Sequence, residues 1–240
     1  VAAIVAGLRC RIYIPQNYHT YRVKEMIDLG AEILRVPGDY ENAVEVSGQD
    51  AQKFDFYDAN PGGSNTMTQL RAYGQIAYEI YDELRDAPLA VTVPVSNGTL
   101  LAGIYRGFVS LHKRGKTSRI PLMIAASSTH KNPIIYSFQK NLESCMDLTP
   151  EKIRETRINE PLINWHSYDG DLALRAVLNT DGWAADASDR EMLRQAKVLR
   201  EKEGLSVLPA STVGLSVLLD RHQRDPLPGD RYVAVLTGRR

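Results

Sequence analysis

The sequence predicts an α/β protein with mostly parallel sheets, divided into two subdomains. Short apolar runs alternate with amphipathic stretches along the chain, which is typical of βαβ units. The runs 89–95 and 121–126 are almost continuously apolar, as expected of strands buried on both faces. A cluster of turn residues at 60–64 divides the pattern. We therefore expect two open α/β/α subdomains, a small one over 1–58 and a large one over 59–240.

The small subdomain is expected to alternate helices and strands. Gly7 and Gly30 follow helical patterns at the position where a helix C-terminus favours glycine. Pro15 closes an apolar run, and His19-Thr20 is expected to begin a helix. The expected helices are 1–6, 21–29 and 40–54, and the expected strands are 10–15, 32–36 and 56–58.

The large subdomain continues the alternation. Ser188 and Glu191 have the spacing of a capping box at a helix start. Thr149-Pro150 has the composition of another helix start. The expected helices are 66–84, 100–111, 133–139, 169–178, 188–203 and 211–222. The expected strands are 89–95, 121–126, 206–208 and 232–236.

Composition excludes several classes of function. Lysine and arginine together number 29, as do aspartate and glutamate, so the chain lacks the basic excess of a nucleic-acid binder. No apolar run approaches the roughly 20 residues that a membrane span needs. Cys10 and Cys145 lie far apart and neither belongs to a CxxC pair, which argues against a metal site or a disulfide framework. We expect a cytoplasmic protein without metal, nucleic-acid or membrane partners.

The most informative segment is VPVSNGT at 93–99, where a buried strand meets a helix through small residues. Such a turn gathers backbone N–H groups and a helix N-terminus around one point, which suits a phosphate. Gly98 allows close approach of the backbone, and Ser96, Asn97 and Thr99 add side-chain donors. The turn matches neither GxxxxGK[ST] nor GxGxxG, so a plain structural turn is the alternative.

Several motifs in sequence order resemble those of threonine synthases. They are Asn60-Pro61 before QLRAYGQIAYEI at 69–80, the turn at 93–99, LPAS at 208–211 and VLTG at 235–238, preceded by CRIYIP at 10–15 and GAEI at 30–33. Over almost all of its 240 residues the chain thus resembles the threonine synthase-like, fold type II enzymes of the tryptophan synthase β-like group. Each motif is loose, but four in register are much harder to meet by chance.

The resemblance implies a cofactor and a reaction. It implies pyridoxal 5'-phosphate, with Ser96, Asn97, Gly98 and Thr99 binding its phosphate and Thr237 hydrogen-bonding its pyridine nitrogen. The implied reaction is β/γ-elimination or replacement on a small amino-acid substrate, as in conversion of O-phosphohomoserine to threonine. A homodimer is also implied, since the group is often dimeric.

Three departures from the pattern limit what is carried over. Ser96 stands where a glycine is usual, and Leu208 stands where glutamate is common. The Schiff-base lysine of the group lies in an N-terminal segment, ahead of a helix that resembles 1–6, and no lysine here has the matching context. We therefore expect that this chain lacks the first segment of the fold, together with its lysine, and does not catalyse alone.

Alternatives remain open at this stage. Another fold type II activity, such as a serine/threonine ammonia-lyase or a cysteine synthase-like enzyme, would share the fold and the phosphate turn. A non-catalytic relative without the lysine could bind a phosphorylated metabolite through the same turn. The segment 159–165 is unusual in composition and is expected to be a loop packed near the site, but the sequence assigns it no role.

Overall fold

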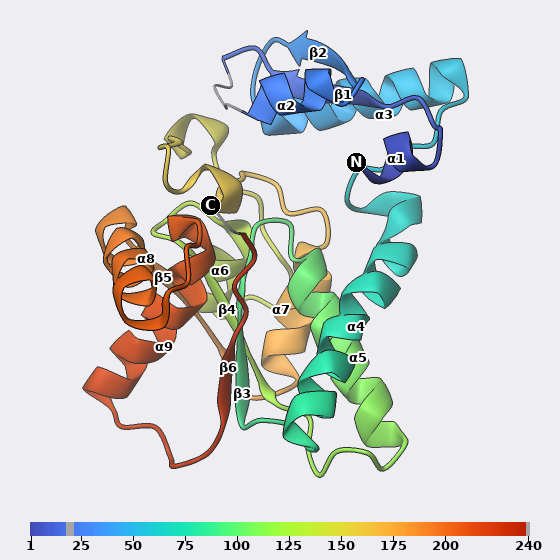
Figure 1. Cartoon of the computed structure of the whole chain (residues 1–240). Coiled ribbons are helices and arrows are strands. Elements are labelled where there is room, and N and C mark those ends of the chain that lie inside the picture. The colour runs from blue at the N-terminus through green and yellow to red at the C-terminus, as the bar shows by residue number, and fades with distance from the viewer. Residues whose placement is uncertain (18–21, 239–240) are drawn as a thin grey trace. The chain divides into compact units, whose positions relative to one another are not determined.

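The computed structural model describes residues 1–17 and 22–238, which form two compact units, Val1–Asn60 and Pro61–Arg240. Along the sequence, the division between the units falls after Asn60, two residues beyond the expected boundary after residue 58. Figure 1 shows the elements of each. The helix start expected at His19-Thr20 lies outside the described residues.

The first unit is a two-stranded parallel sheet with helices. Tyr13 donates a hydrogen bond of 2.6 Å to Asp50, which ties β1 to α3. One expectation was wrong here, because 56–58 is not a strand: the Phe56 N–H bonds back to the Ala51 C=O and so completes the end of α3. The elements are α1 Ala2–Val5, β1 Arg11–Pro15, α2 Arg22–Asp28, β2 Glu32–Val36 and α3 Tyr40–Phe54.

The second unit is a four-stranded sheet of order β5-β4-β3-β6, in which every neighbouring pair is parallel. The α/β class with parallel sheets is therefore confirmed. Its elements are α4 Thr66–Leu84, β3 Ala90–Pro94, α5 Thr99–Lys113, β4 Leu122–Ser128, α6 Pro133–Gln139, α7 Gly170–Leu178, β5 Trp183–Ala187, α8 Asp189–Glu203, α9 Val213–Arg224 and β6 Tyr232–Ala234. Short 3-10 helices lie at Gly63–Asn65, Pro150–Lys152, Glu160–Leu162 and Pro209–Thr212.

Three elements of the second unit differ from expectation. Strand β5 was not predicted, because its alanines and Asp186 have low strand propensity. It forms because its small residues pair with β4, for example Ala184 with Ala125. The expected strand 206–208 is a single bridge at Val207, and the expected helix after Thr149 is one 3-10 turn.

Two hydrophobic cores lie on opposite faces of this sheet. Val91, Val93 and Val95 face helices α4 to α7, and the alternate residue Ala90 faces α8 and α9. Figure 1 shows α8 and α9 on one side of the strands and α4 and α5 on the other. Successive residues of a strand point to opposite faces, so burial on both faces explains why β3 is apolar throughout.

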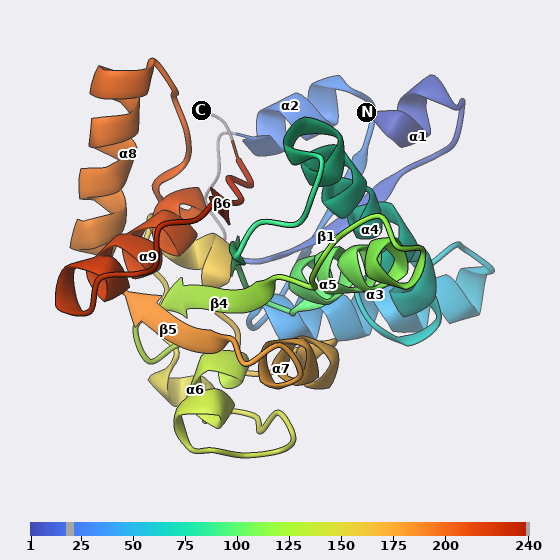
Figure 2. The same ribbon diagram turned by 90° about the horizontal axis from the view of Figure 1, so that it is seen from below.

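Glycines allow α4 and α5 to pack backbone to backbone. A Cβ at Gly107 would lie 2.5 Å from the Gly74 carbonyl oxygen and 2.6 Å from the Ala77 Cβ. A Cβ at Gly103 would lie 2.5 Å from the Tyr73 Cβ. Figures 1 and 2 both show the two helices side by side. The small residues therefore set the distance between these helices.

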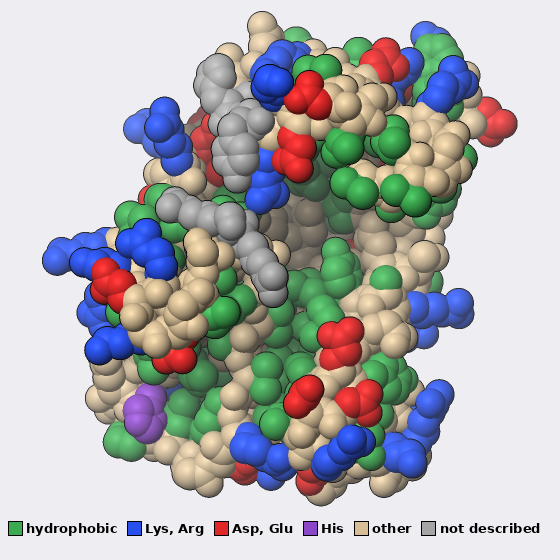
Figure 3. All heavy atoms as spheres, in the orientation of Figure 1, with side chains coloured by type: hydrophobic (Ala, Val, Ile, Leu, Met, Phe, Trp, Pro, Cys, Tyr) green, Lys and Arg blue, Asp and Glu red, His purple; other side chains and the backbone are tan. Residues whose placement is uncertain are grey.

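Strand β6 ends the described sheet, and its residues are only half-buried. Beside it a groove has an apolar floor of Ile80 and Val233 and an acidic rim of Glu79, Asp82 and Glu83. Figure 3 shows hydrophobic side chains open to view on this face of the second unit. Charged side chains beside an outer strand disfavour uncontrolled pairing with other strands.

None of the helices in the described part of the chain is long and apolar enough to cross a membrane.

We expect Gly107→Ala to destabilise the protein by about 1–3 kcal/mol, because the added methyl group overpacks the contact with α4. Urea unfolding measures this. Gly229→Ala is the matched control, since a Cβ there has nothing within 4 Å and should change the unfolding free energy by less than about 1 kcal/mol. Equal effects of the two substitutions would contradict the close-packing argument.

Candidate functional site

The strand order reverses at β3, and this reversal locates the site. From β3 the chain proceeds outward to β4 and β5, and it then returns through α8 and α9 to place β6 on the other side of β3. In open α/β sheets, ligands bind at the carboxyl ends of the strands that flank such a switch point. The turn 96–99 follows the end of β3, and Thr237 follows the end of β6.

The turn ends at the N-terminus of α5. Gly98 is the N-cap residue, with φ of 90°, and it carries no side chain to cap the helix. A Cβ there would lie 2.8 Å from the Ala173 Cβ and 2.9 Å from the Asp169 carbonyl oxygen. Glycine is therefore required both by the left-handed backbone and by the packing. The first-turn N–H groups of α5 have no acceptor within the helix, as at any helix start, and they suit an anion.

The hydroxyl of Thr99 is engaged inside the protein. It donates a hydrogen bond of 2.5 Å to Asp169, whose other carboxylate oxygen accepts from Thr66 at 2.8 Å. Asp169 is 4% exposed, and its N–H donates to the Asn97 carbonyl at 2.9 Å. Thr99 would therefore serve a bound anion through its backbone N–H, while its side chain anchors the turn to α7.

Thr237 is exposed just beyond β6. The adjacent strands are joined there by the Val235 N–H, which donates to the Thr92 carbonyl at 3.0 Å. The Gly238 carbonyl accepts from the Leu208 N–H at 3.0 Å and from the Ser211 hydroxyl at 3.2 Å. The structure thus brings the 208–211 and 235–238 motifs into contact and leaves the Thr237 side chain on the surface beside the switch point.

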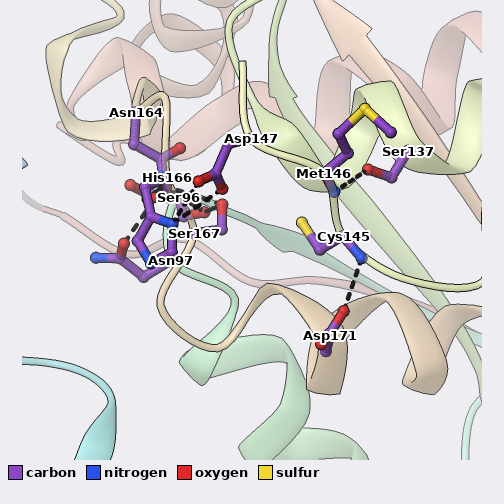
Figure 4. Close-up of polar contacts among 10 residues, drawn as sticks. All are labelled: Ser96, Asn97, Ser137, Cys145, Met146, Asp147, Asn164, His166, Ser167 and Asp171. Atoms are coloured by element: carbon purple, nitrogen blue, oxygen red, sulfur yellow. Dashed lines mark hydrogen bonds and ion pairs between the residues drawn. The ribbon is translucent and has the colours of Figure 1, made fainter. Parts of the chain in front are cut away.

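Sequence analysis missed the residues that hold the carbonyl side of the turn. Asn132, Asn164 and Ser167 are buried, and each donates a side-chain hydrogen bond to the Ser96 carbonyl. Figure 4 shows Asn164 and Ser167 beside Ser96 and Asn97. The only signal in the sequence was the unusual composition of 159–165, because Asn132 is remote from the turn along the chain.

Next to this cluster, the His166 ring lies 2.9 Å from an Asp147 carboxylate oxygen and packs edge-on against Tyr168. Figure 4 also shows Cys145, whose backbone N–H donates to Asp171 at 2.7 Å. Burial raises the pKa of the Cys145 thiol to about 12. Among residues 1–17 and 22–238, no group of three or more His, Cys, Asp or Glu side chains could hold a metal ion.

These features define an open α/β domain in which a turn and an open helix N-terminus lie at the switch point. The open helix N-terminus and the glycine that closes the turn fit the phosphate of a phosphorylated cofactor. The sequence profile of the family described as "Pyridoxal-phosphate dependent enzyme" matches residues 1–238. The chain belongs to this family, and the family's cofactor is pyridoxal 5'-phosphate.

Curated relatives agree with this assignment, and solved structures agree with the fold. The chain is 29% identical to a threonine synthase of Methanocaldococcus jannaschii, over 97% of this chain and 56% of the relative. It therefore spans about half the length of the curated relatives it matches. Maize serine racemase superposes with a TM-score of 0.77 at 18% identity, covering 100% of this chain and 69% of that one. Threonine deaminase isoform 2 from Solanum lycopersicum gives 0.78 at 13% identity, covering 98% and 63%. At these identities the two structures bear on the fold alone.

We expect Gly98→Ala to weaken binding of pyridoxamine 5'-phosphate at least about tenfold, because the turn must move to relieve the contacts with Ala173 and Asp169. Calorimetric titration measures the Kd. Gly204→Ala is the control: it has φ of 68° but nothing within 4 Å of its Cβ, so it carries backbone strain without crowding. A similar loss of affinity in both variants would show that the crowding at Gly98 is unimportant.

We expect the Cys145 thiol to resist alkylation in the folded protein. Its raised pKa keeps the thiol protonated at pH 8, and the thiolate is the reactive form. In a Cys10→Ser variant, mass spectrometry after iodoacetamide treatment should find Cys145 unmodified until urea unfolds the chain. Modification under native conditions at the rate of a free thiol would contradict the raised pKa of this partly buried side chain.

Proposed function

We propose that this chain is the cofactor-phosphate-binding part of an enzyme that catalyses β/γ-elimination or replacement on an amino acid, most like threonine synthase. In that reaction O-phosphohomoserine and water give threonine and phosphate. The observation that carries the proposal is the open N-terminus of α5, which begins at the turn 96–99 beside the switch point. Similarity to named threonine synthases over 97% of this chain supports the choice of reaction.

In this proposal the turn supplies the phosphate site. The phosphate is bound mainly by backbone N–H groups of Ser96, Asn97, Gly98 and Thr99. The Thr99 hydroxyl does not contribute, because it donates its hydrogen bond to Asp169. The dipole of the fifteen-residue helix α5 adds attraction for the negative charge. The buried side-chain donors behind the turn, on Asn132, Asn164 and Ser167, hold the Ser96 carbonyl oxygen away from the phosphate.

Thr237 is the proposed partner of the pyridine nitrogen. Its exposed hydroxyl follows β6, next to the strand that leads into the phosphate turn. Pyridoxal phosphate supplies an electron sink for negative charge at the α carbon of the substrate. A neutral hydroxyl leaves the ring nitrogen largely unprotonated, which damps that sink and favours chemistry at the β and γ carbons.

Other reactions of the family use the same fold. Serine racemase, threonine deaminase and L-serine ammonia-lyase are among the names of the structural neighbours, so the fold does not select a reaction. We propose that the lysine that binds pyridoxal is supplied from outside residues 1–240, and that these residues do not catalyse alone. The alternative is a non-catalytic relative that binds a phosphorylated metabolite.

We expect the chain to bind pyridoxamine 5'-phosphate much more tightly than pyridoxamine, because the turn recognises the phosphate. Calorimetry with both compounds tests this, and neither compound can form a Schiff base with surface lysines. Thr237→Val, which removes the hydroxyl but keeps a β-branched side chain, should weaken both ligands by a similar factor. Equal affinity for the two compounds in the native chain would contradict the phosphate site.

The second arm of the experiment uses the longest reading frame that contains these residues, purified with pyridoxal phosphate. Visible absorbance that borohydride abolishes, with the cofactor then fixed to a lysine, would support an enzyme, and O-phosphohomoserine, serine and threonine would be tested as substrates. Phosphate-dependent binding without such a lysine would favour the non-catalytic relative.

A further inference from the structure

The Ser96 carbonyl, within the phosphate turn, is held by three side chains from two separate segments. It accepts from Asn132 Nδ2 at 3.0 Å, from Ser167 Oγ at 2.9 Å and from Asn164 Nδ2 at 3.3 Å. Asn132 is 1% exposed and Asn164 is 2% exposed. Burying an amide side chain costs free energy unless its hydrogen bonds are made, so the hydrogen bonds to Ser96 help to determine the positions of these two side chains.

Asn132 joins three parts of the second unit. Its Oδ1 accepts from the N–H groups of Ile134 and Ile135 and so caps α6. Its Nδ2 donates to the Ser96 carbonyl and to Asn164 Oδ1, the latter at 2.9 Å. The start of α6, the phosphate turn and the loop of Asn164 are therefore fixed together by one side chain.

Asn164 contributes the other amide of the arrangement. Its Nδ2 lies 2.6 Å from the His166 carbonyl oxygen, 3.0 Å from Ser167 Oγ and 3.3 Å from Asn97 Oδ1. Figure 4 shows this loop folded against Ser96 and Asn97. The amide thus holds its own loop in a compact shape and touches the side chain of the next turn residue.

Peptide geometry translates this hold into the orientation of a donor. The described chain has no cis peptide bond, so the Ser96–Asn97 peptide is planar and trans, and its C=O and N–H point in opposite directions. Fixing the Ser96 carbonyl toward Asn132 and Asn164 directs the Asn97 N–H away from them. Without these hydrogen bonds the Ser96–Asn97 peptide group could rotate as a unit, and its N–H would then point in another direction.

We propose that Asn132 and Asn164 are positioning residues that set the affinity of the turn for a phosphate monoester, by fixing the orientation of the Ser96–Asn97 peptide. This inference rests on the proposed function of the turn and assigns a role to the loop that contains Asn164. Neither residue needs to touch the ligand. The acidic groups near this cluster are already hydrogen-bonded, Asp147 to His166 and Asp169 to Thr99.

The test uses Asn132→Ser and Asn164→Ala in the 240-residue chain. Serine keeps an N-cap acceptor for α6 but removes the Nδ2 donor to Ser96. Each variant should bind pyridoxamine 5'-phosphate and inorganic phosphate about tenfold to a hundredfold more weakly, because the Asn97 N–H is no longer held in the orientation that suits the phosphate. Affinity for pyridoxamine should change less than about threefold, since that ligand has no phosphate.

Asn159→Ala is the matched control. Asn159 is also 1% exposed, and its side chain accepts a hydrogen bond from the Thr156 N–H at 2.8 Å, within its own loop and not from the turn 96–99. It should destabilise folding to a similar degree and leave the preference for the phosphorylated ligand unchanged. Asn164→Gln, which retains the amide, should recover part of the affinity that Asn164→Ala loses.

A merely structural role predicts different outcomes. If Asn132→Ser and Asn164→Ala lose affinity for both ligands in parallel with thermal stability, as the Asn159 control would, the positioning role is overturned. Native phosphate affinity in both variants overturns it as well. A native chain that binds neither phosphate nor pyridoxamine 5'-phosphate instead refutes the proposed function, and this inference falls with it.

Discussion

The geometry of the site depends on the hydrogen bonds that the buried carboxylate of Asp169 accepts. It accepts hydrogen bonds from Thr66 and Thr99, which begin α4 and α5, and it is itself the N-cap residue of α7. The two hydroxyls provide a donor to each oxygen of this buried side chain. Three helix N-termini are thereby brought to one point at the carboxyl end of the sheet.

Close packing around that point leaves little freedom to the turn. Gly98 lies against Ala173 and Ile134, and Gly107 and Gly74 bring α5 onto α4. Behind the turn, buried amides from two other loops donate hydrogen bonds to the Ser96 carbonyl oxygen. A loop that is fixed on both its packing side and its carbonyl side reorganises little, and the proposed phosphate site would benefit from that preorganisation.

Much of this arrangement could be predicted from local pattern. The buried strands at β3 and β4, the capping box at Ser188 and the turn at 96–99 all carry short-range signals. Strand β5 carried none, because alanine and aspartate are poor strand formers and pairing with β4 stabilises it. The strands expected at 56–58 and 206–208 failed for the converse reason: apolar composition favours a strand only where a neighbouring strand accepts its hydrogen bonds.

The sequence by itself determined the parallel α/β class, the turn at 96–99 and the resemblance to pyridoxal-phosphate enzymes, because periodicity, turn residues and motif order are local properties of the chain. Only the tertiary structure decided that β6 lies beside β3, that the Thr99 hydroxyl is given to Asp169, and that Asn132 and Asn164 hold the Ser96 carbonyl. These contacts join residues between 32 and 142 positions apart, as for Asn132 with Asn164 and Ala90 with Tyr232. No local pattern encodes such partners, since burial and hydrogen-bond geometry select them only when the chain has folded.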